Sequence, residues 1–296
     1  MNKPLRANSL GIHALVWVGD TTPDSIRHAV RSTSEAGFDL LELSLHDLER
    51  LDVPGTRTLL AEAGLGVVCS RGLAFDADVS SDDPAVVKRG AALLRASLET
   101  TVGLGGRIFT GALFSALGKY PAAPTPAGRA NAVSVIRELA TAAADNDVTL
   151  GLEVCNRYET NLVNTARQAV ELADDIGADN VMVHLDTYHM NIEEADMARP
   201  VREVGDRLGY VHIGENHRGF LGSGHIDFTS FFHALGDIGY RGPITFESFS
   251  SSVVARGLSD DLAVWRDLWE DGRELADHAL NFTTAMLAVS GPAKHG

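Results

Sequence analysis

Eight short apolar segments alternate with longer segments of helical periodicity along this chain of 296 residues. The apolar segments are continuous, which is typical of strands in a parallel sheet whose two faces are both covered. Strands are expected at residues 10–17, 40–43, 66–70, 107–111, 149–154, 181–185, 210–213 and 244–246. Eight such strand-helix units predict an α/β fold that closes into a (β/α)8 TIM barrel, typically of about 250 residues. The alternative is a doubly wound open sheet, but no Gly-x-Gly-x-x-Gly follows the first strand.

Helices are expected over residues 24–36, 84–102, 126–146, 164–176, 193–208 and 228–238, and a long final helix over 260–287 forms a C-terminal extension. Helix starts with proline in the first turn occur at Thr22-Pro23, Asp83-Pro84 and Thr125-Pro126. Left-handed glycine caps are expected after helices at Gly37, Gly64, Gly103, Gly177, Gly209 and Gly239. The chain is therefore expected to form one barrel domain over residues 1–289, followed by a disordered tail at 290–296.

The net charge of the chain argues against some classes of binding partner. Its formal net charge is −15 at pH 7. Nucleic-acid binders gain most of their affinity by neutralising phosphates, so neither a nucleic acid nor an anionic membrane is an expected partner. The apolar run from Leu10 to Val18 is too short to span a bilayer. The two cysteines, Cys69 and Cys155, do not resemble a disulfide framework, and a cytoplasmic location is expected.

Four ionisable side chains stand at the ends of the last four predicted strands. They are Glu153, Asp186, His212 and Glu247, at successive separations of 33, 26 and 35 positions. Each closes an apolar run, where a lone charged group would be costly without a partner. Any one of them alone would be interpreted as a loop charge or a buried histidine. Because strand C-terminal ends form the active face of a barrel, the shared position instead predicts a centre for a divalent cation such as Mn²⁺, Co²⁺ or Mg²⁺.

Three further polar side chains follow these strand ends in the sequence. Glu159 comes after Glu153, His189 comes after Asp186, and Arg218 comes after His212. Spacing alone does not decide whether these three residues are solvated loop charges or belong to the site.

Four linked motifs resemble the ketose 3-epimerases, the family of D-tagatose, D-allulose (psicose) and L-ribulose 3-epimerases within the sugar isomerase/epimerase barrels. The motifs are Gly-Leu-Glu153-Val-Cys-Asn-Arg-Tyr-Glu159, His-Leu-Asp186-Thr-Tyr-His189-Met-Asn-Ile-Glu-Glu, Val-His212-Ile-Gly-Glu-Asn-His-Arg218-Gly and Phe-Glu247-Ser-Phe249. The match is dense over residues 150–250. The order of the motifs is specific for the family but not for one sugar.

The resemblance implies a metal-dependent isomerase of carbohydrate metabolism that acts on a free ketose. It implies one divalent ion per subunit (Mn²⁺, Mg²⁺ or Co²⁺), held by Glu153, Asp186, His212 and Glu247. It also implies a homodimer or homotetramer. Family members often carry proline after the last metal-binding glutamate, whereas this chain has Ser248. That departure bears on the local backbone and on sugar preference.

The same resemblance implies the roles of the remaining residues. Glu153 and Glu247 would be the acid/base pair, while Glu159, His189 and Arg218 match positions that contact the carbonyl end of the substrate. Epimerising carbon 3 removes a proton beside a carbonyl and returns it on the other face through an enediolate. Two carboxylates are needed because one base would tend to return the proton to the same face. A divalent ion stabilises the negative charge as a Lewis acid.

Aromatic residues are expected to form an apolar wall for the far end of the sugar. The candidates are Trp17, Phe114 and Phe249, each of which is also a candidate for core packing. Trp265 and Trp269, four positions apart in the expected final helix, are interpreted as packing or subunit contacts.

Other functions remain open on this scaffold. The main alternatives are an aldose-ketose isomerase, a hydroxypyruvate isomerase and an inosose dehydratase. The glycine-rich run from Gly219 to Gly224 would suit a sugar phosphate, although the family places it around an unphosphorylated substrate. A metal-dependent abasic-site nuclease would need more metal ligands and a basic groove. A silent sugar-binding barrel would not need Glu153 and Glu247.

Overall fold

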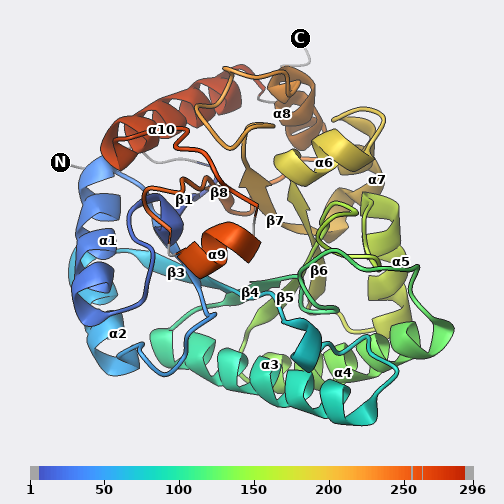
Figure 1. Cartoon of the computed structure of the whole chain (residues 1–296). Coiled ribbons are helices and arrows are strands. Elements are labelled where there is room, and N and C mark those ends of the chain that lie inside the picture. Colours follow the sequence, from blue (N-terminus) through green and yellow to red (C-terminus); the bar gives the residue numbers. More distant parts are fainter. Residues whose placement is uncertain (1–6, 255, 262, 291–296) are drawn as a thin grey trace.

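The computed structural model describes residues 7–254, 256–261 and 263–290. Within that part of the chain, eight strands form a closed parallel barrel in sequence order (Figure 1). They are β1 (Leu10–His13), β2 (Leu40–Ser44), β3 (Gly66–Ser70), β4 (Ile108–Gly111), β5 (Thr149–Glu153), β6 (Val181–Asp186), β7 (Leu208–Ile213) and β8 (Ile244–Phe246). The barrel closes where β8 pairs with β1 and Leu10 lies opposite Ile244. The predicted (β/α)8 TIM barrel is therefore confirmed.

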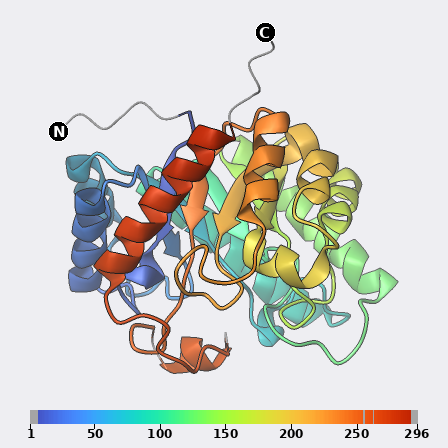
Figure 2. The same ribbon diagram turned by 90° about the horizontal axis from the view of Figure 1, so that it is seen from above.

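Helices surround the barrel in both views (Figures 1 and 2). They are α1 (Pro23–Ala36), α2 (Val53–Ala63), α3 (Pro84–Leu104), α4 (Pro126–Ala144), α5 (Ala166–Ile176), α6 (Thr187–Glu193), α7 (Arg199–Val204), α8 (Phe228–Asp237), α9 (Arg256–Asp261) and α10 (Gly272–Val289), with short 3-10 turns η1 (Ala14–Val16), η2 (Phe75–Ala77) and η3 (Gly205–Arg207). In Figure 1, α9 lies over the centre of the barrel, and Figure 2 shows it beyond one barrel end. None of the described helices combines the length and the apolar composition that crossing a bilayer requires.

Most helix boundaries follow the predicted capping residues. Thr22, Asp83 and Thr125 accept hydrogen bonds from first-turn N–H groups. Two of the expected glycine caps are wrong. The third helix runs through Gly103 and ends at Gly105, whose φ is +85°. Gly209 lies inside β7, where a Cβ would come within 2.5 Å of Met182 Cβ on β6, so close strand packing rather than a turn requires glycine there.

Three longer elements differ from expectation because side chains cap the backbone locally. The predicted first strand ends at His13, whose Nδ1 accepts from the Leu15 N–H and so begins η1. In place of the helix expected over 193–208, the structure has α7 and η3, and only Glu193 of that range belongs to α6, which starts directly after β6 because the Asp186 side chain caps it. The helix expected over 260–287 begins only at Gly272, where the Asp271 carboxylate accepts from two N–H groups.

The interior of the barrel is polar near the four strand-end residues. Thr110 on β4 lies 2.8 Å from His184 on β6, and Glu42 on β2 lies 2.7 Å from the Tyr210 hydroxyl on β7. These strands are not neighbours, so the side chains meet inside the barrel. Barrel interiors are commonly filled by branched apolar side chains, and here hydrogen bonds replace part of that packing.

The C-terminal tail lies almost wholly outside the described residues. Of the predicted disordered segment 290–296, only Ser290 is described, and it is buried at the end of α10. The division into a domain over 1–289 and a tail therefore stays a prediction.

The start of α10 is open to a direct test of stability. Replacing Asp271 with alanine removes the side chain that accepts from the Arg273 and Glu274 N–H groups. We expect the free energy of unfolding to fall by about 1 kcal/mol, measured by urea denaturation. Asp271→Asn, which keeps an N-cap acceptor, is the matched control and should lose clearly less. Equal losses in the two variants would contradict the capping role.

Candidate metal centre

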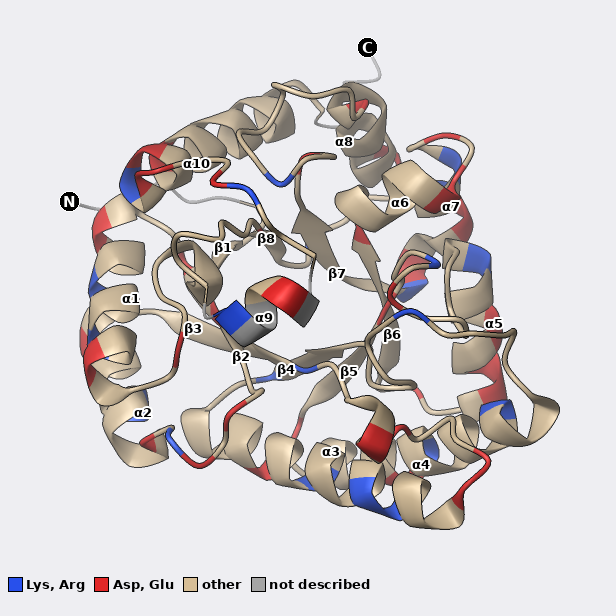
Figure 3. Ribbon diagram, in the orientation of Figure 1, with Lys and Arg blue, Asp and Glu red and all other residues tan. Residues whose placement is uncertain are grey.

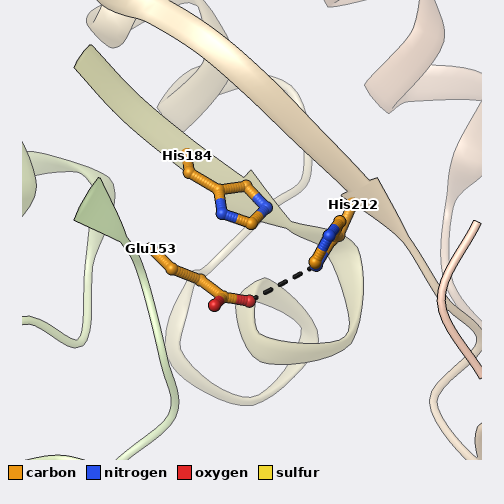
Figure 4. Close-up of side chains that lie close together, drawn as sticks. All are labelled: Glu153, His184 and His212. Carbon is orange, nitrogen blue, oxygen red and sulfur yellow. Dashed lines mark ion pairs between the residues drawn. The ribbon is translucent and has the colours of Figure 1, made fainter. Parts of the chain in front are cut away.

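The structure brings together the four residues at the ends of the last strands. Glu153 ends β5, Asp186 ends β6, His212 lies in β7 and Glu247 follows β8. One ligand atom from each lies within 4.8 Å of the others. His212 Nδ1 is 3.4 Å from Glu153 Oε1, 3.8 Å from Asp186 Oδ2 and 3.7 Å from Glu247 Oε1. Figure 4 shows Glu153 reaching toward the His212 ring. Three carboxylates thus surround one imidazole nitrogen.

Two atoms of this cluster are buried without a hydrogen-bond partner. They are Asp186 Oδ2 and His212 Nδ1, on residues that are 0% and 1% exposed. Leaving such an atom unsatisfied costs about 1–3 kcal/mol. A divalent cation would accept electron pairs from both atoms, and a set of carboxylate oxygens with one imidazole nitrogen suits Mn²⁺, Mg²⁺ or Co²⁺. The residues present therefore fit a divalent metal ion.

The carboxyl groups of the cluster differ in their electrostatic surroundings. Burial raises the pKa of Glu153, the negative charge of Glu247 adds to this, and His212 opposes it. Burial also acts to raise the pKa of Asp186, but the positive charge of Arg218, followed by His189 and His212, outweighs it and holds that pKa below its ordinary value. Arg218 Nη1 lies 3.5 Å from Asp186 Oδ2 and 2.7 Å from Glu247 Oε2. Arg218 thus stabilises the charged form of Asp186, whereas burial disfavours the charged form of Glu153.

His189 points one ring nitrogen at the cluster. The backbone N–H of Asn156 donates to His189 Nδ1 at 3.1 Å, and the Asn156 side-chain nitrogen lies 2.9 Å from the same atom. A backbone N–H can only donate, so a neutral His189 ring carries its proton on Nε2. That atom lies 3.9 Å from carboxylate oxygens of both Glu153 and Glu159. Asn156 also donates to Glu159 Oε1 at 2.8 Å, which links the two side chains.

Arg218 is fixed from several elements at once. Its backbone φ is +61°, and its guanidinium lies 3.7 Å from the centre of the Tyr188 ring. The Ser248 hydroxyl donates to the Arg218 carbonyl oxygen and accepts from Trp269 Nε1, the latter at 2.8 Å. Ser248, the departure from the family pattern, thus holds the loop that carries Arg218.

A small cavity of about 130 Å³ lies beside the cluster. Its walls include Glu159, Tyr188, Arg218 and Phe249, together with Val264, Trp265 and Leu268 of the segment before α10.

The expected placement of Trp265 and Trp269 in the final helix is wrong, since both precede it. Trp269 is buried and bonded to Ser248, whereas Trp265 is 71% exposed at the cavity.

Only one of the three expected wall aromatics reaches this cavity. Phe249 lines it, 4.9 Å from the guanidinium carbon of Arg218. Trp17 instead donates from its indole N–H to Thr33 in α1, and it lines a separate cavity near the start of α10. Phe114 is fully buried in the hydrophobic core and does not line the cavity. The expected strand over 10–17 ends at His13, so Trp17 leaves the barrel interior.

Several residues of the site were not singled out from the sequence. Asn156 and Tyr188 lie within the quoted motifs, but their contacts depend on loop conformation. Glu42, in the run Leu-Leu-Glu42-Leu, carried a usable signal, because a charge inside an apolar strand needs a partner. His184 also offers a ligand atom within 4.8 Å of atoms from Glu153 and His212. Figure 4 draws these three side chains together.

Acidic and basic residues are interspersed along the helices that surround the barrel (Figure 3). The expected free thiols are confirmed, because Cys69 and Cys155 are both buried and unpaired.

Comparison with known proteins relates this geometry to a family. The chain matches the xylose isomerase-like TIM barrel family over residues 30–280. It is 50% identical over 273 residues to a ketose 3-epimerase of Arthrobacter globiformis, covering 92% of this chain and 94% of that protein. It is 50% identical over 272 residues to an L-ribulose 3-epimerase of Methylomonas sp. (strain DH-1), covering 92% and 95%. A crystal structure of D-allulose 3-epimerase from Methylomonas sp. in complex with D-allulose superposes with a TM-score of 0.93 at 48% identity, covering 97% of this chain and 99% of that one.

The tautomer of His189 can be tested by NMR. In protein labelled with ¹⁵N-histidine, we expect the proton of the neutral His189 ring on Nε2, because the Asn156 N–H occupies Nδ1. A His189→Gln variant identifies the signals by their loss. A proton found on Nδ1 would contradict the assigned hydrogen bond.

Proposed function

Because this chain belongs to the ketose 3-epimerases of the xylose isomerase-like TIM barrel family, we propose that it interconverts carbon-3 epimers of a free ketose at the cluster of Glu153, Asp186, His212 and Glu247. The relatives named for L-ribulose and D-allulose support ketoses of the D-allulose/D-fructose, D-tagatose/D-sorbose and L-ribulose/L-xylulose types as substrates. The observation that carries the proposal is the convergence of three carboxylates on His212 Nδ1.

Glu153 and Glu247 carry the two proton transfers. Their Oε1 atoms lie 3.4 and 3.7 Å from His212 Nδ1, and they reach it from β5 and from the end of β8, with β6 and β7 between. One carboxylate removes the proton from carbon 3, and the protonated partner returns one on the opposite face. The configuration of carbon 3 is inverted, and the two glutamates exchange their protonation states.

His189 and Arg218 stabilise the charge that develops on the substrate oxygens. The Nε2–H of His189 and the guanidinium of Arg218 both face the cluster and can donate to an enediolate oxygen. Asn156 and Tyr188 hold these donors in place before the substrate arrives. When bound by Glu153, Asp186, His212 and Glu247, a divalent ion (Mn²⁺, Mg²⁺ or Co²⁺) supplies Lewis-acid polarisation of the carbonyl.

The cavity supports a compact sugar with a polar and an apolar end. Glu159 offers a carboxylate to hydroxyl groups, while Phe249, Val264 and Leu268 give an apolar surface. Phe249 thus remains the proposed aromatic wall, and the segment before α10 supplies the rest of it.

The oligomeric state and the cellular location of the protein are each proposed from a single observation. The resemblance to the family supports a homodimer or homotetramer. The buried, unpaired Cys69 and Cys155 support a reducing compartment such as the cytoplasm.

The reaction is tested by incubating the purified protein with D-fructose, D-tagatose or L-ribulose. We expect the carbon-3 epimer as product, activity lost with EDTA, and activity restored by Mn²⁺, Mg²⁺ or Co²⁺ because the cluster needs a cation. In D₂O the product should carry deuterium at carbon 3. A product with a shifted carbonyl would indicate an aldose-ketose isomerase, and loss of water would indicate a dehydratase.

The acid/base pair is tested by Glu153→Gln and Glu247→Gln, each of which removes a proton-transfer group. We expect kcat to fall by roughly 10²–10⁴-fold, the usual contribution of general acid–base catalysis. Glu171→Gln, on the exposed face of α5, is the control and should retain the parental rate. A Glu247→Gln enzyme that binds metal and epimerises as fast as the parent would remove the assigned role.

A further inference from the structure

A buried carboxylate that the proposed proton transfers do not use lies beneath the metal-ligand cluster. Glu42, in β2, is 0% exposed and reaches across the barrel interior to β7. Its Oε2 atom lies 2.6 Å from His212 Nε2 and 2.7 Å from the Tyr210 hydroxyl. A carboxylate buried this deeply is stable only when donors surround it.

The groups around Glu42 are arranged as donors. His13 Nδ1 accepts from the Leu15 N–H at 3.2 Å, so a neutral His13 ring carries its proton on Nε2, which lies 3.7 Å from Glu42 Oε1. The Tyr210 hydroxyl donates to Glu42 Oε2 and lies 2.5 Å from Thr245 Oγ1 on β8. Oε2 of Glu42 thus accepts from Tyr210, and its contact at 2.6 Å with His212 takes the Nε2–H of that ring, whereas Glu42 Oε1 has no hydrogen-bond partner.

This contact determines what the other side of the His212 ring can do. With the proton on Nε2, the lone pair of His212 lies on Nδ1, the buried atom that has no hydrogen-bond partner. That atom faces Glu153, Asp186 and Glu247 at 3.4, 3.8 and 3.7 Å. A metal-binding imidazole needs a free lone pair on the ligand nitrogen, and its other N–H is commonly held by a carboxylate.

We propose that Glu42 is a positioning residue of the metal centre, which fixes the orientation and tautomer of His212 so that Nδ1 is the ligand atom. The inference rests on the metal centre of the proposed function and deepens it. Glu42 is held across the barrel by Tyr210 on β7, and His13 on β1 lies 3.7 Å from its Oε1 atom. The orientation of the ligand is therefore built into the barrel rather than into the loops.

The test uses Glu42→Gln, which keeps the shape of the side chain and removes its charge. Metal-free protein is titrated with Mn²⁺ alone by calorimetry. We expect Mn²⁺ affinity to fall by roughly 10–100-fold, the usual effect of losing such a partner. Tyr210→Phe, which removes one donor to Glu42, should weaken Mn²⁺ binding by less. Tyr240→Phe is the matched control, because its hydroxyl donates to the Pro243 carbonyl at 2.8 Å and not to Glu42, so Mn²⁺ affinity should be parental.

Two further measurements separate positioning from a purely structural role. A structural role would lower the melting temperature of metal-free Glu42→Gln and leave the Mn²⁺ affinity of the folded protein unchanged, which would overturn the proposal. In ¹⁵N-histidine spectra of the Mg²⁺-loaded parent, we expect the His212 proton on Nε2, and a proton on Nδ1 would also overturn it. If Glu42→Gln does not fold, equal Mn²⁺ affinities of Tyr210→Phe and Tyr240→Phe overturn it. A parent protein that binds no Mn²⁺, or that converts no ketose, refutes the proposed function instead.

Discussion

The active face of this barrel depends on how the fold accommodates buried negative charge. Asp186 and Glu42 have no exposed surface, and Glu247 is only 7% exposed. Within the described residues, Arg218 is the arginine that lies within 4.0 Å of this group of carboxylates. One guanidinium does not balance Asp186, Glu247 and the nearby Glu153, and a buried carboxylate without a partner is strongly unfavourable. The cluster therefore has an excess of buried carboxylates, which suits it to hold a divalent cation.

Rigid placement of Arg218 connects the site to the C-terminal segment. The left-handed backbone at Arg218 is held by the Ser248 hydroxyl, and Ser248 is held in turn by the Trp269 indole. Tyr188 packs against the guanidinium from α6. Segments that follow β6, β7 and β8 therefore meet at Arg218. The segment before α10, which also supplies Trp265 to the cavity, is part of that arrangement.

The barrel and the four strand-end residues could be predicted because each depends on a local rule. A charged side chain that closes an apolar strand needs a partner, and four such side chains at equivalent positions of neighbouring strands are expected to have the same partner. The position of Trp17 could not be predicted, because His13 ends β1 by capping η1 and the indole then bonds to α1. Trp265 and Trp269 show helical spacing, but Asp271 starts the helix after them. Glu42 carried the same signal as Glu153, yet its partners lie on β1 and β7, and pairing across a barrel is invisible in a single sequence.

The polar interior explains why the site is on the strands rather than in the loops alone. Thr110, His184, Tyr210 and Thr245 are each at most 1% exposed, and all take part in hydrogen bonds between strands. Filling the same space with branched apolar residues would bury more hydrocarbon, but it would leave the inner nitrogen of His212 without an acceptor. The hydrogen bond to Glu42 anchors the His212 ring on its inner side and leaves Nδ1 facing the three carboxylates. The barrel thus has less apolar packing in its interior but holds this imidazole in a fixed orientation.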